Sequence, residues 1–267
     1  PRHLQLFEAL GFEPPKFAHL PMIMGPDRAK LSKRHGATAI GEYIVDGYLP
    51  EALLNFMVLL GWSLDDKTDV VSSQTATDNF TLDRVTKSSA IFDQKKLLWM
   101  NGMYIRELTP DQLAAAMTPF LERDLPKDML PVDEEYLRRI APLLQERIKR
   151  LDESADITEY FFRANETFNT DDLVQKGMDR DSTLSALNAA LDDLSGADDF
   201  QHEKLEEMLT ATGEKLELSR RQFFGVLRVA ATGRAVSPPL FEMMEVMGKD
   251  RTVSRVNNAV ERFSAAG

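Results

Sequence analysis

The chain has 267 residues, a formal net charge of −11 and no cysteine. This length allows two or more domains with cores of their own, and the lack of cysteine excludes disulfides and thiolate metal sites. The four histidines are scattered without metal-ligand spacing, and no apolar run is long enough to span a bilayer. We therefore expect a cytoplasmic protein without a metal centre or a membrane segment.

The acidic balance weighs against a nucleic-acid partner without excluding one. Lysine and arginine dominate the affinity for phosphates, yet binding needs only a local basic face. Many of the carboxylates fall in separate runs, at Asp133-Glu134-Glu135, Asp192-Asp193 and Asp198-Asp199. We interpret these runs as solvated helix ends and surfaces.

A short basic loop is predicted near the start of the chain. The apolar run Leu20–Met24 predicts a short strand, and Gly25-Pro26-Asp27 predicts the turn after it. The next segment, Lys30-Leu31-Ser32-Lys33-Arg34-His35-Gly36, brings two lysines, an arginine and a hydroxyl close together. Lysine supplies a point charge, arginine a fork for phosphate oxygens, and serine a donor. These residues favour a clamp on a polyphosphate; the alternative is a basic turn without such a role.

The middle of the chain is predicted to be mainly helical. Pro50 suits the first position of a helix, and Gly61 suits its end. A second short strand is predicted at Val70–Val71. Asp93 is a candidate N-cap, and Asn101-Gly102 is expected to end the helix that begins there.

Capping signals mark further helices in the C-terminal half. Two capping boxes are predicted, at Thr109-Pro110-Asp111-Gln112 and at Ser219-Arg220-Arg221-Gln222. Ser237-Pro238 is expected to begin another helix, which Gly248 ends. The polar stretch from Leu125 to Asp133 is predicted to separate two helical blocks.

Two groups of basic residues are candidates for contact with RNA. The helix that begins at Ser219 has an apolar stripe, and Arg228 flanks this stripe, where an arginine is placed to stack on or bond to an unpaired base. The second group comprises Arg138-Arg139 and Arg147-Ile148-Lys149-Arg150. Ion pairs with neighbouring carboxylates are the competing explanation for this second group.

The basic loop resembles the second signature of class I aminoacyl-tRNA synthetases, the KMSKS loop, in its Lys-Leu-Ser-Lys-Arg form. Its flanks and several later stretches, in the same order, closely resemble bacterial-type glutamyl-tRNA synthetase. The likeness covers nearly the whole chain and is looser between about Leu108 and Ser219. The stretches that carry it are His19–Lys30, Gly36–Thr38, Gly47–Asn55, Leu59–Ser63, Phe92–Asp93, Trp99–Gly102 and Ser237–Phe241.

The resemblance implies a mainly α fold that follows the end of a Rossmann catalytic domain. Residues 1–35 would be the C-terminal remnant of that domain with the KMSKS loop, and residues 36–108 the stem-contact domain. Residues 109–195 and 196–267 would form two subdomains of an all-helical anticodon-binding domain. The related glutaminyl enzyme is disfavoured, because its anticodon region is a β-barrel and this chain reads as helical.

The resemblance also implies a role for the loop in a ligase reaction. In this family glutamate and ATP form an acyl-adenylate, and the glutamyl group then passes to tRNA(Glu). Lys33 would be the main ATP contact, with Lys30 and Arg34 supporting it and Ser32 fixing the loop shape. The family's first signature, His-Ile-Gly-His, is absent here, and the glutamate pocket belongs to the same missing half. We therefore expect this chain alone to be inactive and to need no cofactor, whereas the full-length enzyme uses ATP with Mg²⁺.

The resemblance places three tRNA contacts near the end of the chain, at Arg228, Ser237 and Leu240. Arg147 and Lys149, from the second basic group, are expected to approach the anticodon loop as well. Ser237 as an N-cap and Leu240 as a core residue are the structural alternatives. We expect a monomer whose partner is tRNA(Glu), with ATP and glutamate bound through the missing half.

A second function remains open at this point. The chain could be a free-standing RNA-binding or protein-interaction module derived from such an enzyme. The intact basic loop favours the ligase, because a module that only binds has no use for an ATP clamp.

Overall fold

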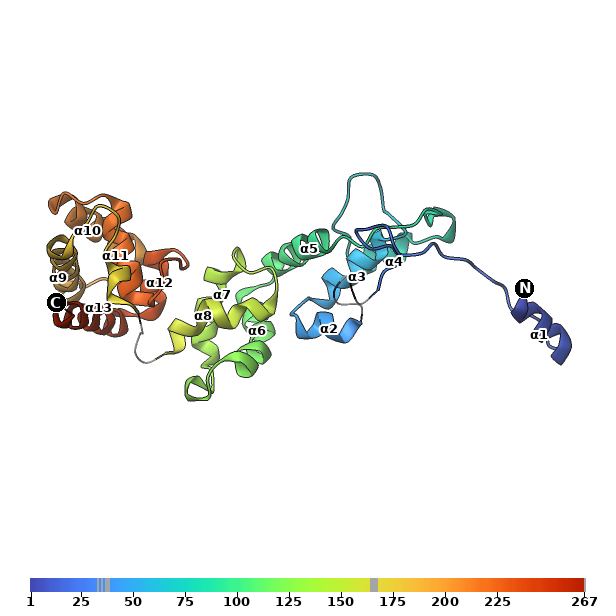
Figure 1. Cartoon of the computed structure of the whole chain (residues 1–267), viewed down its shortest axis with the longest axis horizontal. Coiled ribbons are helices and arrows are strands. Elements are labelled where there is room, and N and C mark those ends of the chain that lie inside the picture. The colour runs from blue at the N-terminus through green and yellow to red at the C-terminus, as the bar shows by residue number, and fades with distance from the viewer. Residues whose placement is uncertain (33, 35, 37–38, 164–167, 267) are drawn as a thin grey trace. The chain divides into compact units, whose positions relative to one another are not determined.

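The computed structural model describes residues 1–32, 34, 36, 39–163 and 168–266 (Figure 1). The chain divides into two compact units. Unit 1 comprises Pro1–Glu42 and Pro50–Leu97, and unit 2 comprises Tyr43–Leu49 and Leu98–Gly267. The two units are described separately below.

Unit 1 is built on short helices. Its core contains Phe56 and Phe92, whose rings meet edge to face with centroids 4.9 Å apart, and the buried Trp62. The helix α5 contributes only its first turn to this unit. The elements are α1 (Arg2–Leu10), α2 (Ile40–Val45, shared with unit 2), α3 (Pro50–Leu59), α4 (Ser73–Asn79), a 3-10 turn (Leu82–Arg84) and the start of α5 (Gln94–Glu107).

The two predicted strands are wrong. Met24 forms isolated bridges with Lys30 and with Ile91, and no longer ladder is found among the described residues. The peptide N–H of Val71 donates to the side-chain oxygen of Asn55 at 2.9 Å rather than to a neighbouring strand. A buried side-chain amide therefore takes the place that a sheet partner would fill at this position.

Unit 2 contains the longer helices. The helices α6 and α7 pack on each other, and α9 packs along α13 with α11 beside both (Figure 1). Ile140 of α7 and Phe223 of α11 are fully buried in these contacts. The helices are α6 (Pro110–Asp124), α7 (Glu134–Gln145), α8 (Ser154–Phe162), α9 (Arg180–Gly196), α10 (His202–Lys215), α11 (Arg220–Thr232), α12 (Leu240–Met247) and α13 (Lys249–Ala265). Three 3-10 turns accompany them, at Lys127–Met129, Leu151–Glu153 and Thr170–Leu173.

Most of the predicted helix ends are confirmed. Both capping boxes are present, at Thr109 and at Ser219. Asp93 caps α5 by accepting from the peptide N–H of Lys95 at 2.8 Å, and Gly248 ends α12. The predicted start at Ser237-Pro238 is wrong, because α12 begins at Leu240 after an N-cap at Pro239.

The predicted helix end at Asn101-Gly102 is also wrong, since α5 continues to Glu107. Asn101 is fully buried, and its amide accepts from the peptide N–H of Leu49 at 2.8 Å while donating to the carbonyl of Lys149 at 2.6 Å. A side chain added at Gly102 would meet the Lys149 side chain at 3.3 Å. This dipeptide therefore joins two distant segments to α5 instead of terminating it.

The packing of α9 bears on the predicted division at residues 195 and 196. Because α9 lies against α13, α10 and α11, residues 180–196 share a core with the later helices. The predicted domain ranges, the division at residues 195 and 196 included, stay predictions.

Candidate functional site

The basic loop is anchored at its base in unit 1. Met24 accepts from the peptide N–H of Phe92 at 2.8 Å, and its own N–H donates to Ala90 at 2.9 Å. A tight turn follows, in which the N–H of Gly25 donates to the carbonyl of Ala29 at 2.8 Å. Asp27 closes the turn by accepting from the N–H of Ala29 at 2.9 Å. The loop therefore leaves a fixed base.

The polar side chains of the loop are exposed where the structure describes them. Lys30 and Ser32 face solvent, and the Arg34 guanidinium pairs with the Asp27 carboxylate at 3.1 Å. Both members of that pair are exposed, so the pair is weak and can exchange Asp27 for another anion. Lys33, the main predicted ATP contact, lies outside the described residues. The four ATP-binding assignments stay predictions.

Arg228 lies in α11 and is partly buried against the loop that follows this helix. Its Nη1 donates to the Ser237 hydroxyl at 2.6 Å and to the Pro238 carbonyl at 2.9 Å. Burial of the guanidinium, helped by the nearby charge of Arg147, lowers the pKa of Arg228. The apolar face of α11 is buried as predicted, through Phe223 and its neighbours. The arginine is therefore held at the edge of a rigid helix.

A cavity of about 360 Å³ opens beside this arrangement. It brings together Arg147 from the second basic group and Ser237 from the end of the chain, and Arg228 is bonded to Ser237 from behind. The lining residues are Arg147, Ile157, Tyr160, Arg234, Val236, Ser237 and Pro238. Two of the five predicted tRNA contacts, Arg147 and Ser237, therefore line one cavity although they are distant in sequence, and a third, Arg228, bonds to one of them.

The other two predicted contacts lie elsewhere. Leu240 is buried at the start of α12, with 4% of its surface exposed. Lys149 is exposed, and its stem passes over Gly102. Neither residue lines the cavity. Their contact with RNA stays a prediction.

The members of the second basic group differ in whether they form ion pairs. Arg138 pairs with Asp111 at 3.0 Å, and Arg150 pairs with Asp152 at 3.1 Å. The competing explanation, ion pairs with neighbouring carboxylates, is confirmed for Arg150, which pairs with Asp152 and Glu153. Arg147 is exposed, and within the described parts of the chain no carboxylate lies within ion-pair distance of it. Its charge is available at the mouth of the cavity.

Sequence reasoning missed two polar residues of the cavity lining, Tyr160 and Arg234. Tyr160 is 3% exposed, and its hydroxyl has no hydrogen-bond partner among the described residues. Burial raises the pKa of this hydroxyl. Arg234 pairs with Asp156 at 3.1 Å and with Glu159 at 3.5 Å on α8. Tyr160 is followed by two phenylalanines, so its pattern is that of an ordinary core segment and gives no signal of a site.

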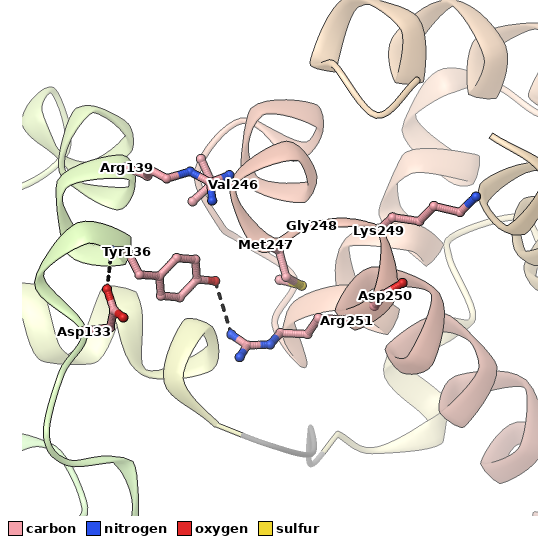
Figure 2. Close-up of a pocket in the computed structure, with 9 residues that line it drawn as sticks. All are labelled: Asp133, Tyr136, Arg139, Val246, Met247, Gly248, Lys249, Asp250 and Arg251. Carbon is pink, nitrogen blue, oxygen red and sulfur yellow. Dashed lines mark hydrogen bonds between the residues drawn. The ribbon is translucent and has the colours of Figure 1, made fainter. Parts of the chain in front are cut away.

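A second cavity, of about 570 Å³, lies between α7 and the junction of α12 with α13 (Figure 2). The guanidinium of Arg251 points to the Tyr136 hydroxyl, to which it donates at 3.2 Å (Figure 2). Arg139 bonds to the Glu245 carbonyl at 3.2 Å. None of the predicted ATP or tRNA contacts that the structure describes lines this cavity.

A search of the described residues for metal-binding clusters of three or more histidine, aspartate or glutamate side chains finds none. None of the helices in the described part of the chain is long and apolar enough to cross a membrane.

Comparisons with known proteins identify both halves of the chain. Residues 112–260 match the model of the anticodon binding domain, and residues 1–99 match the model of the catalytic domain of class I tRNA synthetases (E and Q). A glutamate–tRNA ligase of Dehalococcoides mccartyi is 45% identical over 267 residues. The chain belongs to the glutamate–tRNA ligase family. The mainly helical fold with an anticodon-binding domain is thereby confirmed.

The chain spans about half the length of the glutamate–tRNA ligases that it matches. The alignment with the Dehalococcoides protein covers 99% of this chain and 55% of that protein. A glutamate–tRNA ligase of Roseiflexus castenholzii is 45% identical over 269 residues, covering 100% of this chain and 53% of that protein. A crystal structure of a glutamate tRNA ligase from Elizabethkingia meningosepticum, in complex with its amino acid, matches with a TM-score of 0.79 and 29% identity. That match covers 97% of this chain and 54% of the other.

Proposed function

We propose that this chain is the tRNA-docking portion of a bacterial-type glutamate–tRNA ligase. The whole enzyme activates glutamate with ATP and transfers the glutamyl group to tRNA(Glu). The single observation that supports this function best is the cavity at which Arg147 and Ser237 meet, with Arg228 bonded to Ser237 from behind. The family to which the chain belongs supplies the class of reaction.

The cavity has the chemistry needed to hold an unpaired base. The charge of Arg147 is free of ion pairs within the described residues, and a guanidinium can stack on a base or bond to its edge. Arg228 bonds to Ser237 and Pro238, which line the cavity, and we assign its remaining donors to the same base. Ser237 and Val236 come from the loop after α11 and line the same cavity. We assign the anticodon of tRNA(Glu) to this place.

The basic loop would act at the other end of the reaction. Negative charge develops on the pyrophosphate that leaves ATP, so cations held near it stabilise the transition state. Lys30, Lys33 and Arg34 would supply those cations, and Ser32 would hold the loop shape. The exposed side chains on a fixed base fit a phosphate ligand. ATP with Mg²⁺ and glutamate would bind in the full-length enzyme, and this portion alone would be inactive.

The proposal includes a monomeric protein in the cytoplasm that contains residues 1–35 as the catalytic remnant and residues 36–108 as the stem-contact domain. The anticodon-binding region would follow from residue 109 onward.

The test is binding of this chain to unmodified tRNA(Glu) and to a non-cognate tRNA over a salt series. Wild type is compared with Arg228→Ala and with Arg221→Ala, which removes the same charge from an exposed position of the same helix. We expect tRNA(Glu) to bind more tightly, and Arg228→Ala alone to abolish this preference. Equal and strongly salt-dependent binding of both tRNAs would show contact with the phosphates only and would overturn the anticodon assignment. No binding at all would favour the protein-interaction module.

A further inference from the structure

The cavity has two walls that come from different parts of unit 2. One wall belongs to α8 and contains Tyr160, and the other is the loop after α11, which contains Arg234 and Ser237. A third element, α13, lies behind both walls and carries Arg255, which is 3% exposed. At the cavity itself, Arg234 joins the two walls through its ion pairs with Asp156 and Glu159 of α8. Behind the cavity, the spacing between the walls depends on what Arg255 holds together.

Arg255 bonds to the ends of both wall helices. Its Nη1 donates to the carbonyl of Ala231 in the last turn of α11 at 2.7 Å. Its Nη2 donates to the carbonyl of Tyr160, in the last turn of α8, and to that of Arg163, the C-cap of α8, at 2.9 Å. A single guanidinium thus bridges the two helix ends.

The chemistry of this bridge suits arginine and no other residue. The last carbonyls of a helix lack partners within the helix and carry the negative end of its dipole. A guanidinium offers several donors in a rigid planar fork, so it can satisfy carbonyls of two helices at once and fix the angle between them. Lysine provides the charge as a point on a flexible stem and cannot fix that angle.

Two more arginines on α13 hold neighbouring segments. Arg251 donates to the carbonyl of Phe161 and to the hydroxyl of Tyr136 (Figure 2). Arg262 donates to the carbonyl of Phe168 at 2.9 Å. Positions 251, 255 and 262 lie on one side of the helix, given its period of 3.6 residues. The bond from Arg255 to Ala231 reaches the last turn of α11.

We propose that Arg255 is a positioning residue for base recognition. It does not touch RNA; it sets the distance between the Tyr160 wall and the Ser237 wall, so that the cavity fits one unpaired base. This inference rests on the proposed function for the identity of the ligand, and on the bonds of Arg255 for the geometry. Loss of the guanidinium lets the two walls move apart and lowers selectivity for the cognate anticodon.

The first part of the test measures the distance between the walls. Because the chain has no cysteine, Asp156→Cys on α8 and Val236→Cys in the loop after α11 introduce one exposed and unique spin-label site on each wall. The ion pair of Asp156 with Arg234 is absent from every labelled protein, so its loss does not enter the comparison. The distance distribution is recorded in otherwise wild-type protein, in Arg255→Met and in Arg262→Met. We expect Arg255→Met to broaden or shift the distribution, and Arg262→Met to leave it unchanged. Arg255→Lys, which keeps the charge, is the second variant in case Arg255→Met does not fold.

The second part measures binding of tRNA(Glu) and of a non-cognate tRNA by the same variants without labels, below their unfolding temperatures. We expect Arg255→Met to bind tRNA(Glu) about tenfold more weakly, which corresponds to about 1.4 kcal/mol, with little change for the non-cognate tRNA. Arg255→Lys should recover only part of this loss. Arg262→Met should bind as wild type even if its thermal midpoint falls as far, which separates positioning from general destabilisation.

Either of two results overturns the inference: an unchanged distance distribution in Arg255→Met and Arg255→Lys, or unchanged tRNA selectivity despite an altered distribution. Failure of the proposed function looks different, because wild type itself would then show no preference for tRNA(Glu). In that case the role of Arg255 in base recognition is overturned together with the proposed function. The distance comparison then tests only whether Arg255 fixes the spacing between α8 and α11.

Discussion

The guanidinium of Arg228 donates a hydrogen bond of 2.6 Å to the hydroxyl of Ser237, nine residues further along the chain. That hydroxyl in turn donates to the carbonyl of Pro238 at 3.0 Å. The loop after α11 is therefore folded back onto the helix that precedes it. The two residues act as one unit, and their contributions to binding should not be independent.

Replacing Ser237 by alanine should weaken the hold on Arg228. A hydrogen bond to a charged group contributes about 1.5–3 kcal/mol, and we expect roughly a tenfold loss of affinity for tRNA(Glu), corresponding to about 1.4 kcal/mol. In an Arg228→Ala background the same change should have almost no effect. Isothermal titration of the wild type, both single variants and the double variant checks this, with the exposed Ser195→Ala as control. Additive losses would contradict the coupling.

Replacing Asn101 by alanine should destabilise unit 2 strongly. The N–H of Leu49 and the carbonyl of Lys149 would both lose their partner, and each unsatisfied buried group costs about 1–3 kcal/mol. We expect a loss of about 3 kcal/mol in the free energy of unfolding, measured by urea titration. Asn257→Ala is the control, because this exposed asparagine bonds only to Glu261 among the described contacts. Equal losses for the two variants would argue against the role of Asn101.

Gly47 should not tolerate a side chain. Its φ is +77°, and an added Cβ would lie 2.5 Å from the peptide nitrogen of Asp152. Gly177 has a similar φ of +85°, but its nearest neighbour is the flexible end of Gln222, at 3.3 Å. The backbone term costs about 1–2 kcal/mol in both alanine variants, so we expect Gly47→Ala to be the less stable by at least about 2 kcal/mol, owing to overpacking. Thermal unfolding of both variants tests the difference.

The contact between His202 and Glu245 should make stability depend on pH. The imidazole Nδ1 lies 2.6 Å from a Glu245 carboxylate oxygen, and this hydrogen bond, aided by the charges of Glu203, Glu245 and Glu242, raises the pKa of His202. Because the pKa is higher in the folded state, the contribution is fully present below the unfolded pKa of about 6.5. It is lost as the pH rises through the folded pKa.

The measurement compares wild type with His202→Asn by urea unfolding at pH 5.5 and at pH 8.5. We expect the stability gap between the two proteins to be larger at the lower pH. A gap that is the same at both values, or larger at pH 8.5, would show that protonated His202 does not stabilise the fold.

The sequence predicted the helix starts at Thr109 and Ser219 correctly and the helix end at Asn101-Gly102 wrongly, for a physical reason. A capping box such as that at Thr109 depends on groups within one turn, so the local pattern contains the whole interaction. The outcome at Asn101-Gly102 depends on Leu49 and Lys149, which lie some fifty residues away on either side. The local preference for a helix end is overridden by these long-range bonds, and no pattern within a few residues reveals them.

The candidate site shows the same division. The resemblance points to Arg228 and Ser237, and Arg147 belongs to a basic group that is visible in the sequence; their contacts with tRNA stay predictions. That Arg147 and Ser237 lie at one cavity with Tyr160 follows only from the tertiary structure. Nothing in the sequence indicates that Arg255 is buried, because an arginine on an amphipathic helix is ordinarily exposed. Only the fold shows that this guanidinium lies inside, between two helix ends.

The continuation of α5 through Asn101-Gly102 has a chemical consequence for the ageing of the protein. Asn-Gly dipeptides in flexible chains lose ammonia readily, because the glycine nitrogen can attack the side-chain amide and close a five-membered ring. Here the nitrogen of Gly102 lies within a helix, and the Asn101 amide is held by two other segments. Deamidation at this dipeptide is therefore blocked while the fold is intact, so the accumulation of aspartate at position 101 over storage would record how often this region unfolds.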